Sequence, residues 1–359
     1  MSASLPAPER KSHPFYTYDM IKEIPAGFGT TLQQMKDFPE LKGPITFTGN
    51  GTAFYAAVMG SQILNQVKAP WRAVQGLELT HYAPSAEKGI VVGVSHSGIT
   101  KATVDPLQRA KQSGAFVIAL THFPDRPISK VADRTYVIGN GPDKSRCHTK
   151  TYVDSAAAVM KIALEYARSC GSALPAIQRE FEGSLLDKLA LAVRNSEQPA
   201  RKAAQELSPI KKVFFVGAGP NLVTAREAAL KVKETSYLAA EGIELEEFQH
   251  GAWSALDKET AVIAVTPEGP ARERTESLIG ASRKIGAKTI VVSDGSFEAD
   301  YVLRFPSTPE YLSPFLGIIP LYFLSYFLAV GKGNNPDYLR YLDPTYWAAR
   351  QIVFPPGTH

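Results

Sequence analysis

The 359-residue sequence has few cysteines and little net charge, and each shortage excludes a class of protein. Its two cysteines, Cys147 and Cys170, have a spacing that fits neither a zinc site nor a redox motif. Lysine and arginine number 39 against 35 aspartates and glutamates, and the net charge of +4 is too small to predict a nucleic-acid partner. We expect free thiols in a reducing cytoplasm and no bound metal.

Long apolar runs are also scarce, and one stretch, residues 315–330, could be mistaken for a membrane span. It contains Pro320 and three polar side chains and is shorter than the roughly 20 residues that a bilayer requires. The first residues, Met1 to Pro6, have no apolar core of the signal-peptide kind. We therefore expect a protein that is not exported and has no membrane partner, with residues 315–330 forming a buried core or interface helix.

The sequence does contain enough apolar residues to form the cores of two domains. Hydrophobic residues make up 44% and charged residues 21%, which are ordinary values for a globular protein. Apolar runs that end in a turn and lead into a helical stretch occur in both halves, and corresponding runs are offset by about 170 residues. They lie at residues 44–49, 90–95 and 114–121 in the first half and at residues 212–217, 261–266 and 286–293 in the second.

This near-constant offset predicts an internal duplication. Continuous apolar runs are typical of parallel strands covered by helices on both faces. The predicted fold class is therefore α/β, with two subdomains that are each a doubly wound parallel sheet flanked by helices. We expect a helical lead-in over residues 1–40, a first subdomain over 41–170, a helical linker over 171–210, a second subdomain over 211–335 and a C-terminal tail over 336–359.

The loop after the second predicted strand is rich in hydroxyl groups. Ser95, Ser97, Thr100 and Thr103 surround the start of a predicted helix, where free backbone N–H groups and the positive helix end favour an anion. An ordinary N-cap needs only one hydroxyl. We predict a phosphate cradle here; the turn over residues 50–53 either adds a hydroxyl to it or is a bare turn.

The corresponding loop of the second half, residues 266–270, contains two prolines and a glutamate. Prolines remove N–H donors and a carboxylate repels an anion, so we expect this copy to have lost phosphate binding. We predict one phosphate site per chain.

The second half instead concentrates acidic and basic groups. On the helix predicted after Gly219, Glu227, Lys231, Glu234 and Glu241 share one stripe, and alone this pattern favours a solvated face with ion pairs. His250, beside a glycine in a loop, is by itself a surface residue. The glycine pair 217 and 219 lacks the third glycine of a dinucleotide site, so no cofactor is predicted.

Together these motifs resemble the sugar isomerase (SIS) family. More narrowly, they resemble the tandem-SIS isomerase half of glucosamine-6-phosphate synthase and its stand-alone relatives. The resemblance extends from His13 to Gly333 and implies two tandem SIS domains. The motifs that carry it are residues 95–100, the Thr149–Lys150 pair, residues 227–237 and residues 247–251.

The resemblance implies a role for each site residue. Glu234 would move a proton between C1 and C2, with Lys231 beside it. His250 would assist ring opening and can be lent by the neighbouring subunit of a homodimer, which places the active site at or near the dimer interface. Residues implied to bind the sugar 6-phosphate are Ser95, His96, Ser97, Thr100, Gly51, Thr52, Ala53, Thr149 and Lys150.

Three features depart from the synthase. The sequence opens at Met1 without a glutamine-hydrolysing domain, so we expect glutamine not to be the internal ammonia source. No lysine follows Lys332, whereas the synthase forms a Schiff base through a lysine near its C-terminus. His96 and Ala53 replace a glutamine and a serine common in the synthase loops, which predicts altered recognition of the sugar hydroxyls.

The leading hypothesis is an enzyme that acts on an (amino)hexose 6-phosphate by C1/C2 proton transfer, similar to a glucosamine-6-phosphate deaminase/isomerase. The alternatives are a deglycase that splits a fructosamine-type sugar 6-phosphate from an amino acid, and a plain aldose-ketose phosphosugar isomerase. From a different class comes a non-catalytic sugar-phosphate-binding regulatory protein. Against a DNA-binding regulator, the roughly 40 residues before Ile45 leave too little room for a helix-turn-helix domain.

Overall fold

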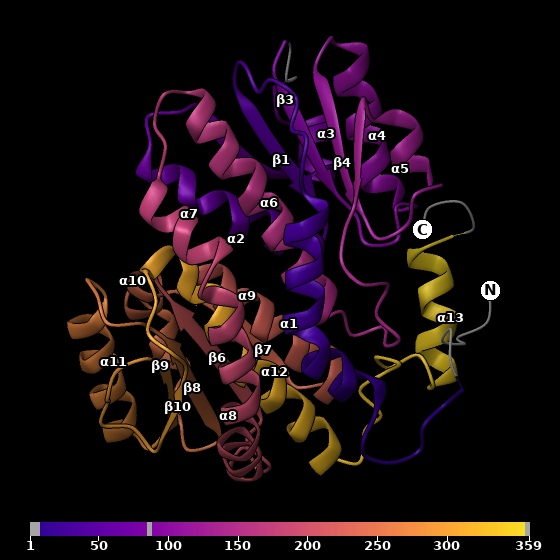
Figure 1. The fold of residues 1–359 in the computed structure, drawn as a ribbon. Helices are drawn as coiled ribbons and strands as arrows, with labels where there is room; N and C mark the ends of the chain where they lie inside the picture. Colours follow the sequence, from indigo (N-terminus) through magenta and orange to yellow (C-terminus); the bar gives the residue numbers. More distant parts are fainter. Residues whose placement is uncertain (1–7, 85–87, 356–359) are drawn as a thin grey trace. The chain divides into compact units, whose positions relative to one another are not determined.

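The structure is a computed structural model that describes residues 8–84 and 88–355 (Figure 1). The chain divides into two compact units. What we call the first unit contains residues 23–143 and 150–183 and the described residues from 343 onward. The second unit contains residues 184–342, the short segment 144–149 and the described residues up to 22.

Each unit is built on one five-stranded parallel sheet. The order is β2-β1-β3-β4-β5 in the first unit and, read from the other edge, β7-β6-β8-β9-β10 in the second. The two orders are the same, which confirms the predicted duplication and the doubly wound α/β fold. The strands are β1 (Ile45–Gly49), β2 (Trp71–Gln75), β3 (Ile90–Val94), β4 (Phe116–Thr121), β5 (Arg134–Val137), β6 (Lys212–Gly217), β7 (Ala239–Glu244), β8 (Thr260–Val265), β9 (Lys288–Ser293) and β10 (Tyr301–Arg304).

Helices cover both faces of each sheet (Figure 1). The helices of the first unit are α2 (Thr52–Ser61), α3 (Gly76–His81), α4 (Lys101–Gln112), α5 (Pro127–Val131), α6 (Lys150–Ser169), α7 (Pro175–Glu182) and α13 (Pro344–Val353), of which α13 has no buried residue. In the second unit they are α8 (Leu185–Glu206), α9 (Asn221–Ser236), α10 (Leu245–Gln249), α11 (Arg272–Ile285) and α12 (Ser313–Gly331). Helix α1 (Tyr16–Gln34) belongs to the second unit up to Lys22 and to the first from Glu23 onward. Short 3-10 turns lie at Gln62–Gln66, Ala252–Ala255 and Glu310–Leu312.

Within each sheet the core is made by the central strands. Every residue of β1, β3 and β8 is buried, as expected for strands covered on both faces. Helix α4 packs on β3, and α9 packs on β6 and β7. Because the strands are parallel, the loops at their carboxyl ends gather at one edge of the sheet, which is where ligands bind in such folds.

One helix boundary differs from the prediction. Helix α9 ends at Ser236, and Tyr237 adopts a left-handed conformation with φ of 58°, so Glu241 lies on β7 and not on the helix. Helix α6 begins at Lys150, which puts that lysine in its first turn. Glu241 is thereby removed from the charged stripe.

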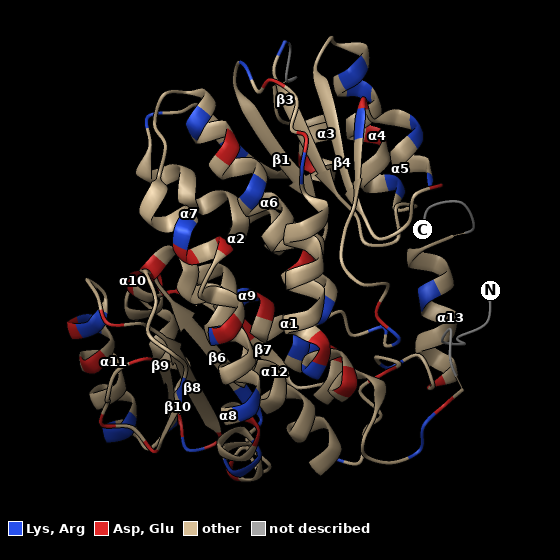
Figure 2. Cartoon of the chain, in the orientation of Figure 1, with Lys and Arg blue, Asp and Glu red and all other residues tan. Residues whose placement is uncertain are grey.

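The apolar segment near the C-terminus lies inside the second unit. By length and composition Glu310–Gly331 could cross a membrane, and it is the one such segment among the described residues. In the structure, 89% of its most apolar window is buried, with α12 packed against α8 and α9. This agrees with the buried helix predicted for residues 315–330. Figure 2 shows no charged residue on α12, whereas elsewhere positive and negative residues are interspersed.

Candidate functional site

The phosphate loop, residues 95–100, connects β3 to α4. Ser95 is buried, and its hydroxyl accepts a hydrogen bond from the Gly98 amide at 3.1 Å. Gly98 has a φ of 67°, so a residue without Cβ is needed at this turn. Ser97 and Thr100 are only partly buried, and Thr100 is the last residue before the helix. Their hydroxyls and the adjacent amides are therefore the groups best placed to meet an anion.

The turn after β1 is joined to this loop within the first unit. Gly51 has a φ of 55° and precedes Thr52, the first residue of α2. The side-chain amide of Asn50 donates to the Thr103 hydroxyl at 2.9 Å. Two of the four predicted cradle hydroxyls, those of Ser95 and Thr103, thus also hold the loops in place. The bond joins the turn after β1 to the first turn of α4, which follows the neighbouring strand β3 at the crevice where this fold binds ligands.

The remaining residues predicted for substrate binding have different surroundings. His96 is half-buried and its ring lies against that of His122, with the ring centroids 4.7 Å apart.

Thr149 is buried in the second unit. Lys150 is 2% exposed, and its ammonium lies 3.2 Å from the Glu23 carboxylate in the first unit. The lysine that the resemblance implies for phosphate binding is therefore already paired with a carboxylate. Ala53, next to Thr52, lies in the first turn of α2.

Three charged side chains on α9 form an acid–base cluster in the second unit. The Lys231 ammonium lies 2.8 Å from Oε2 of Glu234 and 3.3 Å from Oε1 of Glu227. The side chains of Lys231 and Glu227 are 1% and 0% exposed, whereas that of Glu234 is 22% exposed. The Tyr322 hydroxyl of α12 donates to Glu227 at 3.3 Å. The solvated-face alternative for this stripe is therefore wrong, because two of its three residues are in the core.

The electrostatics of this cluster keep Lys231 charged. Burial alone would lower the pKa of Lys231, but the nearby carboxylates of Glu227 and Glu234 outweigh it, and the pKa is raised. Cys147, on the segment before α6, adds to this effect. The cluster thus has one ammonium between two carboxylates, and only the Glu234 end reaches solvent. Such a lysine can stabilise negative charge but cannot act as a base.

The surroundings of His250 differ from those of this cluster. It follows α10, its side chain is 75% exposed, and its Nδ1 lies 2.8 Å from the Glu246 carbonyl oxygen. Among the described residues it makes no hydrogen bond to Glu234. The site residues that the sequence missed are Glu227, taken as part of a surface face, and the buried pair His122 and Asp154. A lone aspartate within the apolar run of α6 was the available signal for the latter.

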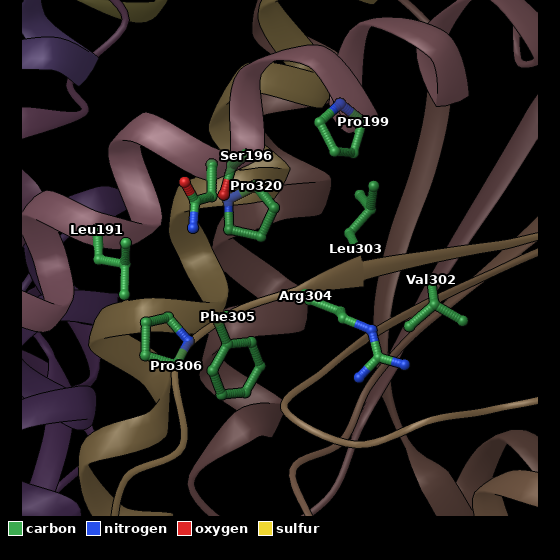
Figure 3. Close-up of a pocket in the computed structure, with 10 residues that line it drawn as sticks. Leu191, Ser196, Pro199, Val302, Leu303, Arg304, Phe305, Pro306 and Pro320 are labelled. Carbon is green, nitrogen blue, oxygen red and sulfur yellow. The ribbon is translucent and has the colours of Figure 1, made fainter.

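Two other features bear on where a ligand or metal could bind. A cavity of about 300 Å³ in the second unit lies between α8, β10 and α12, and Figure 3 shows that Ser196 and Arg304 line it together with apolar and proline side chains. None of the predicted site residues lines it. Within the described part of the chain, no group of three or more His, Cys, Asp or Glu side chains could hold a metal ion.

The fold is a duplicated parallel α/β unit, with a hydroxyl-rich loop in one copy and a buried cluster of acidic and basic side chains in the other. The chain belongs to the SIS family: the SIS domain matches residues 42–164 and again residues 206–331. The arrangement resembles the isomerase half of glucosamine-6-phosphate synthase and the SIS-type phosphosugar isomerases and deaminases.

Individual relatives agree with this assignment. A glutamine–fructose-6-phosphate aminotransferase of Thermococcus kodakarensis is 31% identical over 302 residues, covering 82% of this chain and 50% of that protein. The C-terminal domain of the Francisella tularensis glucosamine-fructose-6-phosphate aminotransferase superposes with a TM-score of 0.82 at 22% identity, over 92% of this chain and 99% of that one. A glucosamine-6-phosphate deaminase from Thermotoga maritima gives 0.77 at 20% identity, over 90% and 96%. The chain spans about half the length of the curated relatives it matches.

Proposed function

We propose that this chain is a phosphosugar enzyme that transfers a proton between C1 and C2 of an (amino)hexose 6-phosphate, with deaminase/isomerase chemistry. The observation that carries the proposal is the cluster on α9, in which a buried ammonium holds a carboxylate that reaches solvent. The named relatives act on fructose 6-phosphate or glucosamine 6-phosphate, which supports this substrate class. The proposal assigns the phosphate to the loop of the first unit and the proton transfer to the second.

In this proposal Glu234 is the base. A carboxylate can remove the acidic proton alpha to a carbonyl or imine and return it to the adjacent carbon through an enediol or enolamine. Its partly exposed side chain, at 22%, leaves room for a substrate, whereas Glu227 is sealed in the core. Glu227 therefore serves to keep Lys231 charged and in place.

Lys231 supplies positive charge beside the reacting carbons. Negative charge develops on the substrate oxygen as the enediol forms, and a fixed ammonium stabilises it best where water is excluded. Lys231 is almost completely buried and protonated, and it contacts the base at 2.8 Å. We assign it to charge stabilisation and not to imine formation, because an imine requires an unprotonated amine.

The phosphate loop anchors the substrate. Ser97 and Thr100 supply hydroxyls, Ser95 and Gly98 maintain the turn, and the start of α4 supplies backbone donors. Holding the phosphate fixes where C1 and C2 lie, which converts binding energy into orientation. Lys101, the first residue of α4, pairs with Asp105 at 2.6 Å, so the hydroxyls and amides are the main phosphate ligands in this proposal.

We further propose a homodimer in which His250 assists ring opening in the neighbouring subunit. The support is its position after α10, where its imidazole is 75% exposed and is held by its own helix and not by the α9 cluster. An imidazole can donate or accept a proton near neutral pH, as ring opening requires.

The test is a panel of 6-phosphosugars that includes glucose 6-phosphate, fructose 6-phosphate, glucosamine 6-phosphate and fructosamine 6-phosphates of amino acids. Ammonia, free amino acid and ketose are measured separately in each reaction. Ammonia release supports the deaminase, amino-acid release the deglycase alternative, and ketose formation alone the plain isomerase. Binding without any product would contradict the enzyme and favour the regulatory protein.

A further inference from the structure

Behind the phosphate loop are two buried side chains that the proposed chemistry does not use. The ring of His96 lies against that of His122, with the ring centroids 4.7 Å apart and the planes at 52°. Nε2 of His122 lies 3.4 Å from Oδ2 of Asp154 on α6, and both of these side chains are 0% exposed. We call these three residues, all in the first unit, the His–His–Asp chain. It leads from the phosphate loop into the core.

The backbone joins the same two loops. The amide of His122 donates to the carbonyl oxygen of His96 at 3.2 Å, and the Thr121 hydroxyl lies 3.3 Å from the same oxygen. The Ser95 amide in turn donates to the Leu120 carbonyl at 3.0 Å. The loop that carries His122 therefore supports the phosphate loop directly, and a change at His122 is transmitted to His96 through both backbone and ring.

Asp154 occupies a space that two glycines leave open for it. A Cβ on Gly27 would lie 2.4 Å from Oδ1 of Asp154, and a Cβ on Gly139 would lie 2.4 Å from Oδ2. Oδ1 has no hydrogen-bond partner among the described residues. Burial raises the pKa of the Asp154 carboxyl, and His122 offsets this only in part.

Burying a carboxyl group costs free energy when one of its oxygens has no hydrogen-bond partner. A contribution to stability therefore does not explain this residue. What it does provide is a fixed partner for one edge of the His122 imidazole. That edge faces Asp154, and the ring is left to contact His96. The arrangement therefore favours a role in the geometry of the phosphate loop over a role in the stability of the core.

We propose that Asp154 is a positioning residue of the phosphate site, which acts through His122 to hold the ring of His96 and thereby the loop that binds the sugar phosphate. The inference rests on the proposed function and adds a buried support to it. Asp154 touches no ligand in this account, so its effect must pass through His96.

A double-mutant cycle tests this dependence. The affinity for fructose 6-phosphate is measured by calorimetry for the wild type, Asp154→Asn, His96→Ala and the double variant. We expect each single change to weaken binding by about fivefold or more, and the double variant to bind within about twofold of His96→Ala. In turnover assays the KM of Asp154→Asn should rise in the same proportion while kcat stays within about twofold of the wild type.

Asp133→Asn is the matched control. Oδ2 of Asp133 accepts from the Val117 amide at 2.8 Å, at the opposite end of β4, and the carboxylate pairs with Lys111 at 3.0 Å. This change should lower the thermal midpoint without altering the affinity. If Asp154→Asn does not fold, His122→Gln replaces it in the cycle under the same criteria.

The inference is overturned if Asp154→Asn binds within about twofold of the wild type, or if its effect adds to that of His96→Ala. Ser97→Ala separates this failure from failure of the proposed function. Where the wild type binds fructose 6-phosphate and Ser97→Ala loses it, the phosphate loop is the binding site and the cycle judges Asp154 alone. Where the wild type binds neither fructose 6-phosphate nor inorganic phosphate, both the proposed function and this inference are wrong.

Discussion

At the scale of single residues, Lys231 is a charged group buried in the core of the second unit. Removing an ammonium from water is expensive, and the cost is recovered only where carboxylates are held close to it. Glu227 and Glu234 do this at 3.3 Å and 2.8 Å. A protein that needed only a stable core would be served as well by apolar side chains here, so the cluster indicates chemistry.

Replacing Lys231 with methionine should therefore destabilise the protein. The change leaves Glu227 buried without its cation, which costs about 3–5 kcal/mol of unfolding free energy. Lys101→Met is the control, because its pair with Asp105 is exposed and is worth at most about 1 kcal/mol. Denaturant unfolding of both variants measures the difference, and equal losses would contradict a tightly coupled buried cluster.

The stability that this cluster supplies also has a predictable pH dependence. The pKa of Lys231 is raised above its ordinary value of 10.5 in the folded protein. Its contribution is therefore complete below about pH 10.5 and is lost only as the pH rises through the higher folded-state pKa. Unfolding measured from pH 7 to 10 should show no loss from this residue, and a decline that is present in the wild type and absent from Lys231→Met would contradict this assignment.

At the scale of secondary-structure elements, glycine determines the shape of the phosphate loop. Gly98 has a φ of 67°, and a Cβ there would lie 2.6 Å from the Cβ of Arg126. Gly114, after α4, has a φ of 85°, but a Cβ there would have no other atom within 4 Å. The two glycines thus have the same conformational requirement and differ in whether a side chain would displace the loop.

Gly98→Ala should weaken the binding of fructose 6-phosphate by about tenfold, because both strain and the contact with Arg126 move the loop. Gly114→Ala should cost about 1 kcal/mol of stability through its left-handed conformation and leave the affinity unchanged. Calorimetric titration with thermal unfolding separates the two effects. An unchanged affinity in a folded Gly98→Ala variant would show that the phosphate binds elsewhere.

The position of each strand in its sheet explains whether the strand could be predicted from the sequence. The six predicted strands are central in the sheets, where two neighbours and two helical layers select continuous apolar runs. The four that were missed, β2, β5, β7 and β10, are the edge strands, whose residues are mostly only partly buried or exposed. Their residues, such as the AAEGIE of β7, have no apolar pattern to detect.

At the candidate site, the charged stripe of α9 could likewise be predicted only in part from the sequence. Glu227, Lys231 and Glu234 lie on one helix as their spacing predicts, but spacing alone does not distinguish a buried face from a solvated one. Glu241 fits the helical period, yet the left-handed Tyr237 ends the helix before it. The contact of His122 with Asp154 joins residues 32 apart in sequence and arises only when β4 and α6 pack in the same unit.

At the scale of the whole molecule, duplication has produced two sheets of the same order with different loops. The loop after β3 keeps hydroxyls and a glycine with positive φ, whereas its counterpart after β8 has two prolines and Glu268, whose carboxylate pairs with Arg272. The second copy thus supports acid–base chemistry in the proposed enzyme while the first anchors phosphate.

The proposed homodimer, in which each site uses residues of both subunits, leads to a further prediction at this scale. Glu234→Gln and His250→Ala chains should each form an inactive homodimer. If His250 acts in the neighbouring subunit, a hybrid of the two chains contains one complete site and should regain about half of the wild-type activity per dimer. Purification with two different affinity tags isolates the hybrid, and a hybrid as inactive as its parents would mean that His250 is not lent between subunits.

The central claim is that Glu234 moves a proton between C1 and C2, and isotope exchange tests it whatever the final product. The enzyme is incubated with fructose 6-phosphate or glucosamine 6-phosphate in deuterated water, and deuterium at C1 and C2 is measured by NMR. We predict incorporation by the wild type and by Glu241→Gln, whose changed residue lies on β7, and a rate at least about 100-fold lower for Glu234→Gln. Exchange by Glu234→Gln at the wild-type rate, or no exchange by the wild type with either sugar, would contradict the account.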